Sequence, residues 1–113
     1  MRLTTEKLRT GYDFLRSAAP YCRWGLPPGK EVKFLITAAA KVYGDHLLLT
    51  DGAHRIRISN QFHGHPYTLL KTLAHEMLHV HQAERELPIE HDAEFMRLWR
   101  LVCKHHGFDP LNP

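Results

Sequence analysis

Residues 66–85 read PYTLLKTLAHEMLHVHQAER, and this stretch has a clear helical period. Its large apolar residues recur three or four positions apart, at Leu69, Leu70, Leu73, Met77 and Val80. Proline is favoured in the first turn of a helix and disfavoured in its interior, so Pro66 suits the start and Pro88 must lie beyond the end. The spacing therefore predicts one amphipathic helix from Pro66 or Tyr67 to about Arg85.

The other side of this helix carries two histidines one turn apart. With His75 at zero and about 100° per residue, His79 falls at about 40° and Glu76 at about 100°, while the large apolar residues fall between about 140° and 220°. Two imidazoles at this spacing can converge on one metal ion, beside a glutamate that can act as a base. Ten histidines in 113 residues make a chance HExxH a real alternative. The position of HEMLH, opposite the apolar side, argues against chance.

A catalytic zinc ion takes three protein ligands and keeps a fourth position for water. His91 is the best candidate for the third ligand, because it lies beyond the break at residues 87–88, where the chain can turn back. A carboxylate from Glu90 or Glu94 is the alternative. Zinc lowers the pKa of its bound water to about 7, and Glu76 is placed to take the proton as that water attacks a carbonyl.

The rest of the sequence predicts an α+β fold with a single domain over residues 1–113. The expected elements are an N-terminal helix at residues 4–18, short antiparallel strands at 32–37, 46–50 and 54–59, and a last helix at about 92–105. Asp51-Gly52 is a tight-turn signal between two of the strands, and Gly107 suits the C-terminal cap of the last helix. A helix, then strands, then two helices is an order typical of α+β domains.

Composition excludes several classes of protein. No apolar run approaches the roughly 20 residues needed to span a bilayer, and the N-terminus has no secretory signal, so we expect no membrane association and a cytoplasmic location. The net charge of +3 permits contact with nucleic acid without requiring it. Cys22 and Cys103 form no CxxC pair, which excludes a cysteine-based zinc ribbon; two free buried thiols are expected. Composition does not bear on the oligomeric state.

From about Arg55 to Trp99 the sequence resembles the SprT-like family of zinc metallopeptidases, which includes the bacterial SprT proteins and Spartan. The resemblance rests on IRIS at residues 56–59, on TLAHEMLHVHQ at 72–82, and on HDAEF at 91–95 leading into a helix. Asp92 stands where the family usually has glycine. The resemblance implies a zincin-like fold and Glu76 as the base. It also implies zinc held by His75, His79 and His91.

The function implied by the resemblance is a zinc-dependent endopeptidase that acts on protein or peptide substrates. Association with DNA is implied because the eukaryotic branch acts on DNA-bound proteins, although the sequence shows no DNA-recognition element. An extended substrate is expected to add to an exposed strand edge, with residues 54–59 as the candidate strand. The alternative function is a zinc-stabilised module that binds nucleic acid or protein without proteolysis. It requires a closed site, with a fourth ligand from His63, His65 or Glu94.

The other candidate residues have plainer interpretations. His81 falls at about 240° on the wheel, near the apolar side, and is expected to be packed and hydrogen-bonded. His63 and His65 lie in a polar loop and are expected to be solvated. Three residues are conceivable oxyanion partners, each expected to be structural first: Tyr43, Arg55 and Tyr67.

Overall fold

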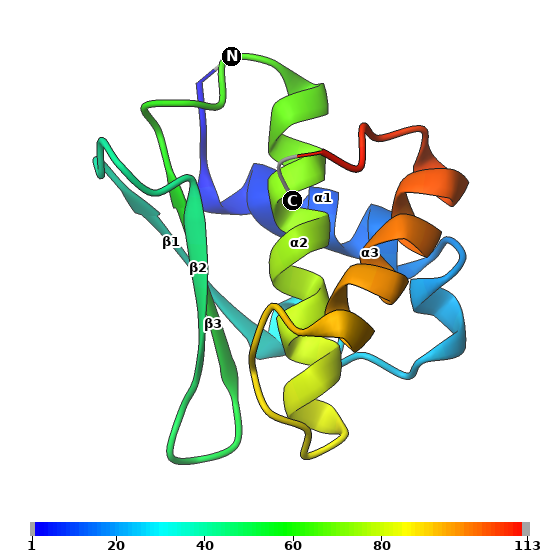
Figure 1. Cartoon of the computed structure of the whole chain (residues 1–113). Helices are drawn as coiled ribbons and strands as arrows, with labels where there is room; N and C mark the ends of the chain where they lie inside the picture. The colour runs from blue at the N-terminus through cyan, green and yellow to red at the C-terminus, as the bar shows by residue number, and fades with distance from the viewer. Residues whose placement is uncertain (1, 112–113) are drawn as a thin grey trace.

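The computed structural model describes residues 2–111 and has the α+β order expected from the sequence, with the helices packed on one side of a small sheet (Figure 1). Helix α2 lies between the sheet and α3 and also contacts α1, so it is the central element. In chain order the elements are α1 (Thr5–Arg16), the 3-10 turns η1 (Tyr21–Arg23) and η2 (Gly29–Glu31), the strands β1 (Val32–Thr37), β2 (Gly44–Leu48) and β3 (His54–Ser59), and the helices α2 (Pro66–Glu84) and α3 (Ala93–His106).

The sheet is mixed, with strand order β1-β3-β2. The expected antiparallel pairing holds for β2 and β3 only, because β1 pairs with β3 in parallel. The alternation of apolar residues predicts which side chains point inward, but it carries no information on which strands are neighbours. One expectation is wrong as a result: β3, the strand proposed to receive a substrate, is paired along both edges. The strand with a free edge beside α2 is β2.

The hairpin between β2 and β3 is longer than the predicted tight turn. The N–H of Leu49 donates to the carbonyl of Ala53 at 2.8 Å, which closes the turn around residues 50–52. Gly52 adopts a φ of 86°, which glycine accommodates without strain. Asp51 accepts a hydrogen bond from the N–H of Ala53 and stabilises the turn further. Strand β2 therefore begins at Gly44 and ends at Leu48, two residues earlier at each end than the strand predicted at 46–50.

Helix α2 begins at Pro66 and ends at Glu84, as predicted. Its large apolar residues point into the core, where the side chains of Leu73, Met77 and Val80 are fully buried. The polar side is also covered, because β2 and the segment before α3 lie against it. Glu76, for example, is 4% exposed. The helix thus holds its polar side chains in an enclosed site, where interactions between them are stronger than in water.

Two glycines let other elements approach α2 closely. A Cβ at Gly11 of α1 would lie 2.8 Å from Cδ1 of Leu73, so glycine brings α1 against the core side of α2. A Cβ at Gly44 would lie 2.8 Å from the carbonyl oxygen of Arg57 and 3.1 Å from Cγ2 of Thr72. Glycine at position 44 therefore lets the start of β2 lie directly on α2.

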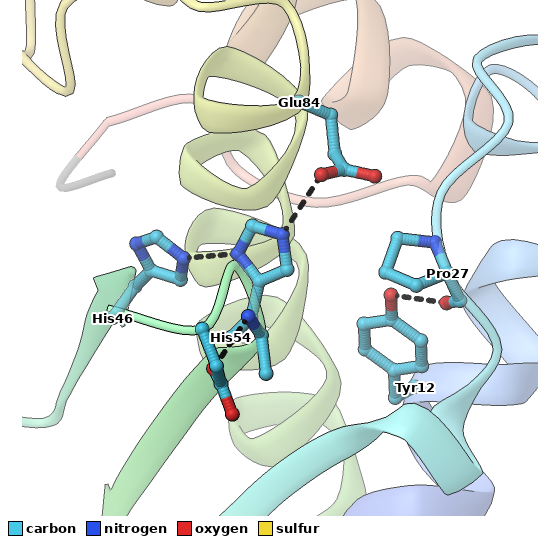
Figure 2. Close-up of polar contacts among 7 residues, drawn as sticks. Tyr12, Pro27, His46, His54 and Glu84 are labelled. Atoms are coloured by element: carbon cyan, nitrogen blue, oxygen red, sulfur yellow. Dashed lines mark hydrogen bonds and ion pairs between the residues drawn. The ribbon is translucent and has the colours of Figure 1, made fainter. Parts of the chain in front are cut away.

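The flanking helices are capped as the sequence indicates. The Thr4 side chain accepts a hydrogen bond from the N–H of Lys7 at the start of α1. In α1, Tyr12 is fully buried and donates its hydroxyl to the carbonyl of Pro27 at 2.6 Å (Figure 2). At α3, Asp92 accepts from the N–H of Phe95, and Gly107 ends the helix at a φ of 74°, as predicted.

Both cysteines are free, as expected, but only Cys103 is buried. Cys22 is exposed, since it lies in the 3-10 turn η1 on the surface. None of the helices in residues 2–111 is both long enough and apolar enough to cross a membrane.

Candidate metal centre

Three histidines meet beside α2. His75 and His79 lie one turn apart on this helix, and His91 lies in the segment that leads into α3. The Nε2 atoms of His75 and His91 are 3.0 Å apart, and those of His79 and His91 are 3.1 Å apart. With one ligand atom from each residue, the three nitrogens lie within 4.8 Å of one another, so the group could hold a metal ion. These are the three residues that the sequence proposed as ligands.

The hydrogen bonds around this group show that it fits a cation. Nδ1 of His79 lies 2.8 Å from Oε1 of Gln82, an oxygen that only accepts, so Nδ1 carries the proton. In a neutral imidazole, Nε2 of His79 then presents a lone pair toward His91. Nε2 of His91 is either a donor to one neighbour or an acceptor from His75, so at least one of its two close contacts lacks a hydrogen bond and the two nitrogens there repel each other. A metal ion removes this repulsion by accepting the lone pairs.

Burial favours the neutral, metal-binding form of two of these imidazoles. The pKa of His75 is lowered to about 3, first by burial and then by the neighbouring His79 and His91. The pKa of His79 is lowered as well, mainly by burial, although its hydrogen bond to Gln82 acts in the opposite direction. Both groups therefore offer lone pairs at neutral pH without first losing a proton.

The ring of Phe95 forms one wall of the histidine cluster. Its centroid lies 5.1 Å from that of His75, 5.0 Å from that of His79 and 4.8 Å from that of His91. The Asp92 cap fixes the first turn of α3 and thereby the position of Phe95. Phe95 is fully buried and belongs to the hydrophobic core. It also packs against all three candidate ligands.

Glu76 is held next to the cluster with little access to solvent. Its pKa is raised to about 8, first by burial and then by the negative charge of Asp45. A cation bound nearby would lower this pKa again, because it stabilises the ionised carboxylate. A carboxyl group whose protonation is this sensitive to its surroundings is suited to transfer a proton.

A cleft of about 680 Å³ opens onto the cluster. One wall is the segment that enters β2, and the other is the side of α2 that carries His75 and Glu76. Two of the conceivable oxyanion partners, Tyr43 and Tyr67, line this cleft, and Arg55 does not. A groove of about 730 Å³ between α1 and the start of α2 contains none of the three histidines. The cleft at the cluster is therefore the one that bears on metal chemistry. Its lining residues are Lys41, Val42, Tyr43, Gly44, Tyr67, Thr68, Lys71, Thr72, His75, Glu76 and His91.

The carboxylates that competed for the third ligand position have other roles. Glu94 accepts two hydrogen bonds from Arg97, of which the one to Nε is 2.9 Å long. Glu90 contributes its backbone, since its carbonyl accepts from Nε2 of Gln82 at 2.9 Å. Within residues 2–111, neither carboxylate joins the group formed by the three histidines.

Three other histidines have surroundings of their own. His63 was expected to be solvated, but it is buried. Its Nδ1 lies 2.6 Å from the carbonyl of Ser59 and its Nε2 lies 2.9 Å from Oγ1 of Thr72. His65 is exposed at the N-terminus of α2. His81 is packed as expected, in a ring stack with Trp24, but its buried Nδ1 has no hydrogen-bond partner among the described residues.

A second histidine network borders the cluster, and the sequence did not predict it. Figure 2 shows the imidazoles of His46 and His54 side by side, with the carboxylate of Glu84 beyond them. Nε2 of His46 lies 2.8 Å from Nδ1 of His54, whose Nε2 lies 3.2 Å from Oε2 of Glu84. The pKa of His46 is lowered to about 4, first by burial and then by His54 and His79. No local pattern signals this network, because its members come from three different elements.

Gln82 is the other residue of the site whose role was missed. It shares the histidine side of α2, about 20° from His75 on a helical wheel, and this was the available signal. Its partners, His79 and the carbonyl of Glu90, could be identified only in the folded chain.

Comparisons with known proteins found no match among family models, curated proteins or solved structures. The resemblance to the SprT-like family, with the DNA association it implies, therefore stays a prediction that rests on the quoted motifs.

Proposed function

We propose that this protein is a zinc-dependent endopeptidase, with His75, His79 and His91 as the zinc ligands and Glu76 as the base. The observation that carries the proposal is the composition of the cluster. Three imidazoles converge, no fourth histidine, cysteine, aspartate or glutamate joins them within residues 2–111, and a cleft opens at their side. Three protein ligands and an open position characterise catalytic zinc sites, whereas structural sites are closed by a fourth ligand.

Zinc is the metal that this donor set favours. Imidazole nitrogen suits zinc, copper, iron and nickel, while calcium and magnesium prefer oxygen ligands. Among these metals, zinc is the one most often held by three histidines in hydrolytic sites.

The residues of the cleft can supply a base and hydrogen-bond donors for the hydrolysis of a peptide bond. When bound, zinc supplies a water molecule of lowered pKa and a positive charge for the oxyanion that develops. Glu76 accepts the proton of the attacking water and delivers it to the leaving amine. It can take this role because it lies next to the histidine cluster. Tyr43 and Tyr67 line the cleft and are the candidates to donate a hydroxyl to the oxyanion; the Tyr67 hydroxyl accepts from the N–H of Asp109, which leaves its own proton free to donate.

The substrate is proposed to lie extended along β2. This strand pairs with β3 along one edge only and begins at Gly44, which lines the cleft. Addition of a peptide to the free edge would satisfy backbone groups of β2 and lead the peptide to the histidines. β2 therefore replaces β3 as the candidate strand for substrate addition, because both edges of β3 are already paired.

The alternative, a binding module with structural zinc, needs a fourth ligand. His63 uses both ring nitrogens in hydrogen bonds, and Glu94 is paired with Arg97. His65 is exposed at the start of α2 and is not part of the cluster. The arrangement supports the open, catalytic site over the closed one.

Metal analysis and proteolysis test this proposal together. We expect about one zinc ion per chain in the wild type, loss of zinc in His91→Ala, and retention in Glu94→Ala. Retained zinc in His91→Ala together with loss in Glu94→Ala would show that the third ligand is wrong.

Casein cleavage then separates an enzyme from a binding module. Glu76→Gln should keep its zinc and lose cleavage by a factor of at least about 100, since general acid–base catalysis contributes 10²–10⁴-fold. Glu90→Gln is the matched control, because this side chain is exposed and only its backbone carbonyl serves the site. Equal cleavage by wild type and Glu76→Gln would overturn the proposed function.

A further inference from the structure

The side chain of Gln82 connects the second candidate ligand to the chain that carries the third. It lies on α2 three residues after His79 and is 3% exposed. Its Oε1 is 2.8 Å from Nδ1 of His79, and its Nε2 donates to the carbonyl of Glu90 at 2.9 Å. Glu90 directly precedes His91, so one amide group contacts both parts of the cluster.

The chemistry of these groups leaves a single arrangement of protons. The carbonyl of Glu90 can only accept, so Gln82 must present its NH₂ group there. The oxygen of the same amide therefore faces His79, and because it also only accepts, Nδ1 of His79 must be the protonated nitrogen. A backbone carbonyl thus determines the tautomer of His79 through the Gln82 amide, and the lone pair is left on Nε2, toward His91.

The second effect of this amide is on the position of His91. Residues 84–94 are exposed throughout, so little packing holds the segment in place. It is fixed on the far side of His91 by Asp92, which caps α3. On the near side it is fixed by the bond from Gln82 to Glu90 and by a bond from the N–H of Leu87 to the carbonyl of Gln82. Gln82 therefore anchors the backbone immediately before the third ligand.

We propose that Gln82 is the positioning residue of the metal centre: its amide sets the tautomer of His79 and holds His91 within reach of the same ion. This inference rests on the proposed zinc site. Partners that orient a metal-bound histidine through its second nitrogen typically change metal affinity 10–100-fold when removed. Here one side chain performs that function for one ligand and places the backbone of another.

Two substitutions separate the two contacts of the amide. Gln82→Met has a similar length and removes both hydrogen bonds. Gln82→Glu keeps an acceptor for Nδ1–H of His79, and a carboxylate is a frequent partner of metal-bound histidine. An ionised glutamate cannot donate to the carbonyl of Glu90, so this variant loses only the contact that holds the segment before His91. Gln61→Met is the matched control, because it makes the same change at an exposed glutamine.

The first measurement is zinc affinity, by competition with a chromogenic chelator, on variants whose zinc-free form is folded by circular dichroism. We expect Gln82→Met to bind zinc about 10–100-fold more weakly than the wild type, and Gln61→Met to bind it equally well. The zinc affinity of Gln82→Glu should lie between those of Gln82→Met and the wild type. In a His91→Ala background, whose weak residual zinc binding is measured at raised zinc concentration, Gln82→Glu should add no further loss of affinity, whereas Gln82→Met should, because its effect on His79 remains.

The second measurement reports on the tautomer without any metal. Long-range ¹H–¹⁵N spectra of the zinc-free protein distinguish an imidazole protonated on Nδ1 from one protonated on Nε2. We expect the Nδ1–H form of His79 in the wild type and in Gln82→Glu, and a shift toward the Nε2–H form in Gln82→Met. If Gln82 served only to stabilise the fold, Gln82→Met would have a lower melting temperature. The tautomer of His79 and the zinc affinity of the folded variant would then be unchanged.

Failure of this inference is distinguishable from failure of the proposed function. Wild-type zinc affinity in folded Gln82→Met, or an Nε2–H tautomer of His79 in the zinc-free wild type, would overturn the inference and leave the zinc site intact. A wild type that binds no zinc would overturn both.

Discussion

The rings of Phe95 and His79 stack, with their centroids 5.0 Å apart and their planes 20° from parallel. One residue comes from the first turn of α3 and the other from the second half of α2, so this contact joins the two helices at the candidate metal centre. Because Phe95 also packs against the other two candidate ligands, the hydrophobic core and the site share a wall. Stability and metal binding should therefore be coupled at this residue.

Replacing Phe95 by alanine should affect both properties. Removal of a fully buried phenylalanine costs about 3–5 kcal/mol of unfolding free energy, and the three rings that it contacts would lose their support. The measurement is denaturant unfolding with and without zinc, whose difference reports the metal-linked stabilisation. Leu98→Ala on the same helix is the control, since Leu98 lines a separate hollow with Trp24 and His81. It should lower stability and keep the stabilisation by zinc; equal zinc-linked stabilisation in both variants would contradict the prediction.

Gly44 should tolerate no side chain. An added Cβ would lie 2.8 Å from a backbone oxygen of β3, and that atom cannot move without displacing the strand. We expect Gly44→Ala to lose about 1–3 kcal/mol of unfolding free energy, as overpacking in other cores does. Thermal unfolding measures it. Gly64→Ala is the matched control, because a Cβ there meets nothing within 4 Å. Similar melting temperatures for both variants would show that position 44 does not lie this close to the carbonyl oxygen of Arg57.

The pair Asp45–Arg57 should make stability depend on pH in the acid range. The pKa of Asp45 is lowered from 3.8, first by its hydrogen bonds to Arg57. A carboxyl whose pKa is lower in the folded state stabilises the fold above its unfolded pKa, and this contribution is lost as pH falls through the folded pKa. Both side chains are 39% exposed, so the effect should be small and weakened by salt.

Asp45→Asn tests this dependence. It should be less stable than the wild type at pH 7, and the difference should be smaller at pH 2, because protonation removes the wild-type charge as pH falls through the lowered pKa of Asp45. Urea unfolding at the two pH values measures it. An unchanged difference at low pH would mean that the charge of Asp45 is not what stabilises the pair.

Two neighbouring leucines of β2 should respond differently to proline. The N–H of Ser59 donates to the carbonyl of Tyr43, and that of Leu49 donates to Ala53. In an antiparallel pair such bonded positions alternate, so Leu47 belongs to the ladder with β3, whereas the N–H of Leu48 faces the free edge.

Leu47→Pro should therefore destabilise the fold, while Leu48→Pro should preserve the ladder and the zinc content. If a substrate adds to this edge, Leu48→Pro should also raise the KM for an extended peptide several-fold. Thermal unfolding and peptide cleavage check the two parts. Equal loss of stability in both variants would show that the register does not leave Leu48 at the free edge.

Features that depend on neighbours along the chain could be predicted from the sequence. The apolar period and Pro66 were sufficient to predict α2, and helical geometry then places His75 and His79 one turn apart in any fold that keeps this helix. The N-terminal cap of α3 at Asp92 and its C-terminal cap at Gly107 are local in the same sense, since each bonds the backbone within four residues.

Features that depend on contacts between distant segments could be identified only in the folded chain. Strand order, and with it the choice of β2 over β3 as the free edge, follows from pairing that the alternation of side chains does not encode. The burial of His63 likewise depends on contacts that form only in the folded chain, and the network from His46 to Glu84 joins residues from separate elements. At the candidate metal centre, local geometry accounts for two histidines. The third is brought to them by the return of an exposed segment, which a buried amide on α2 and the cap of α3 hold in place.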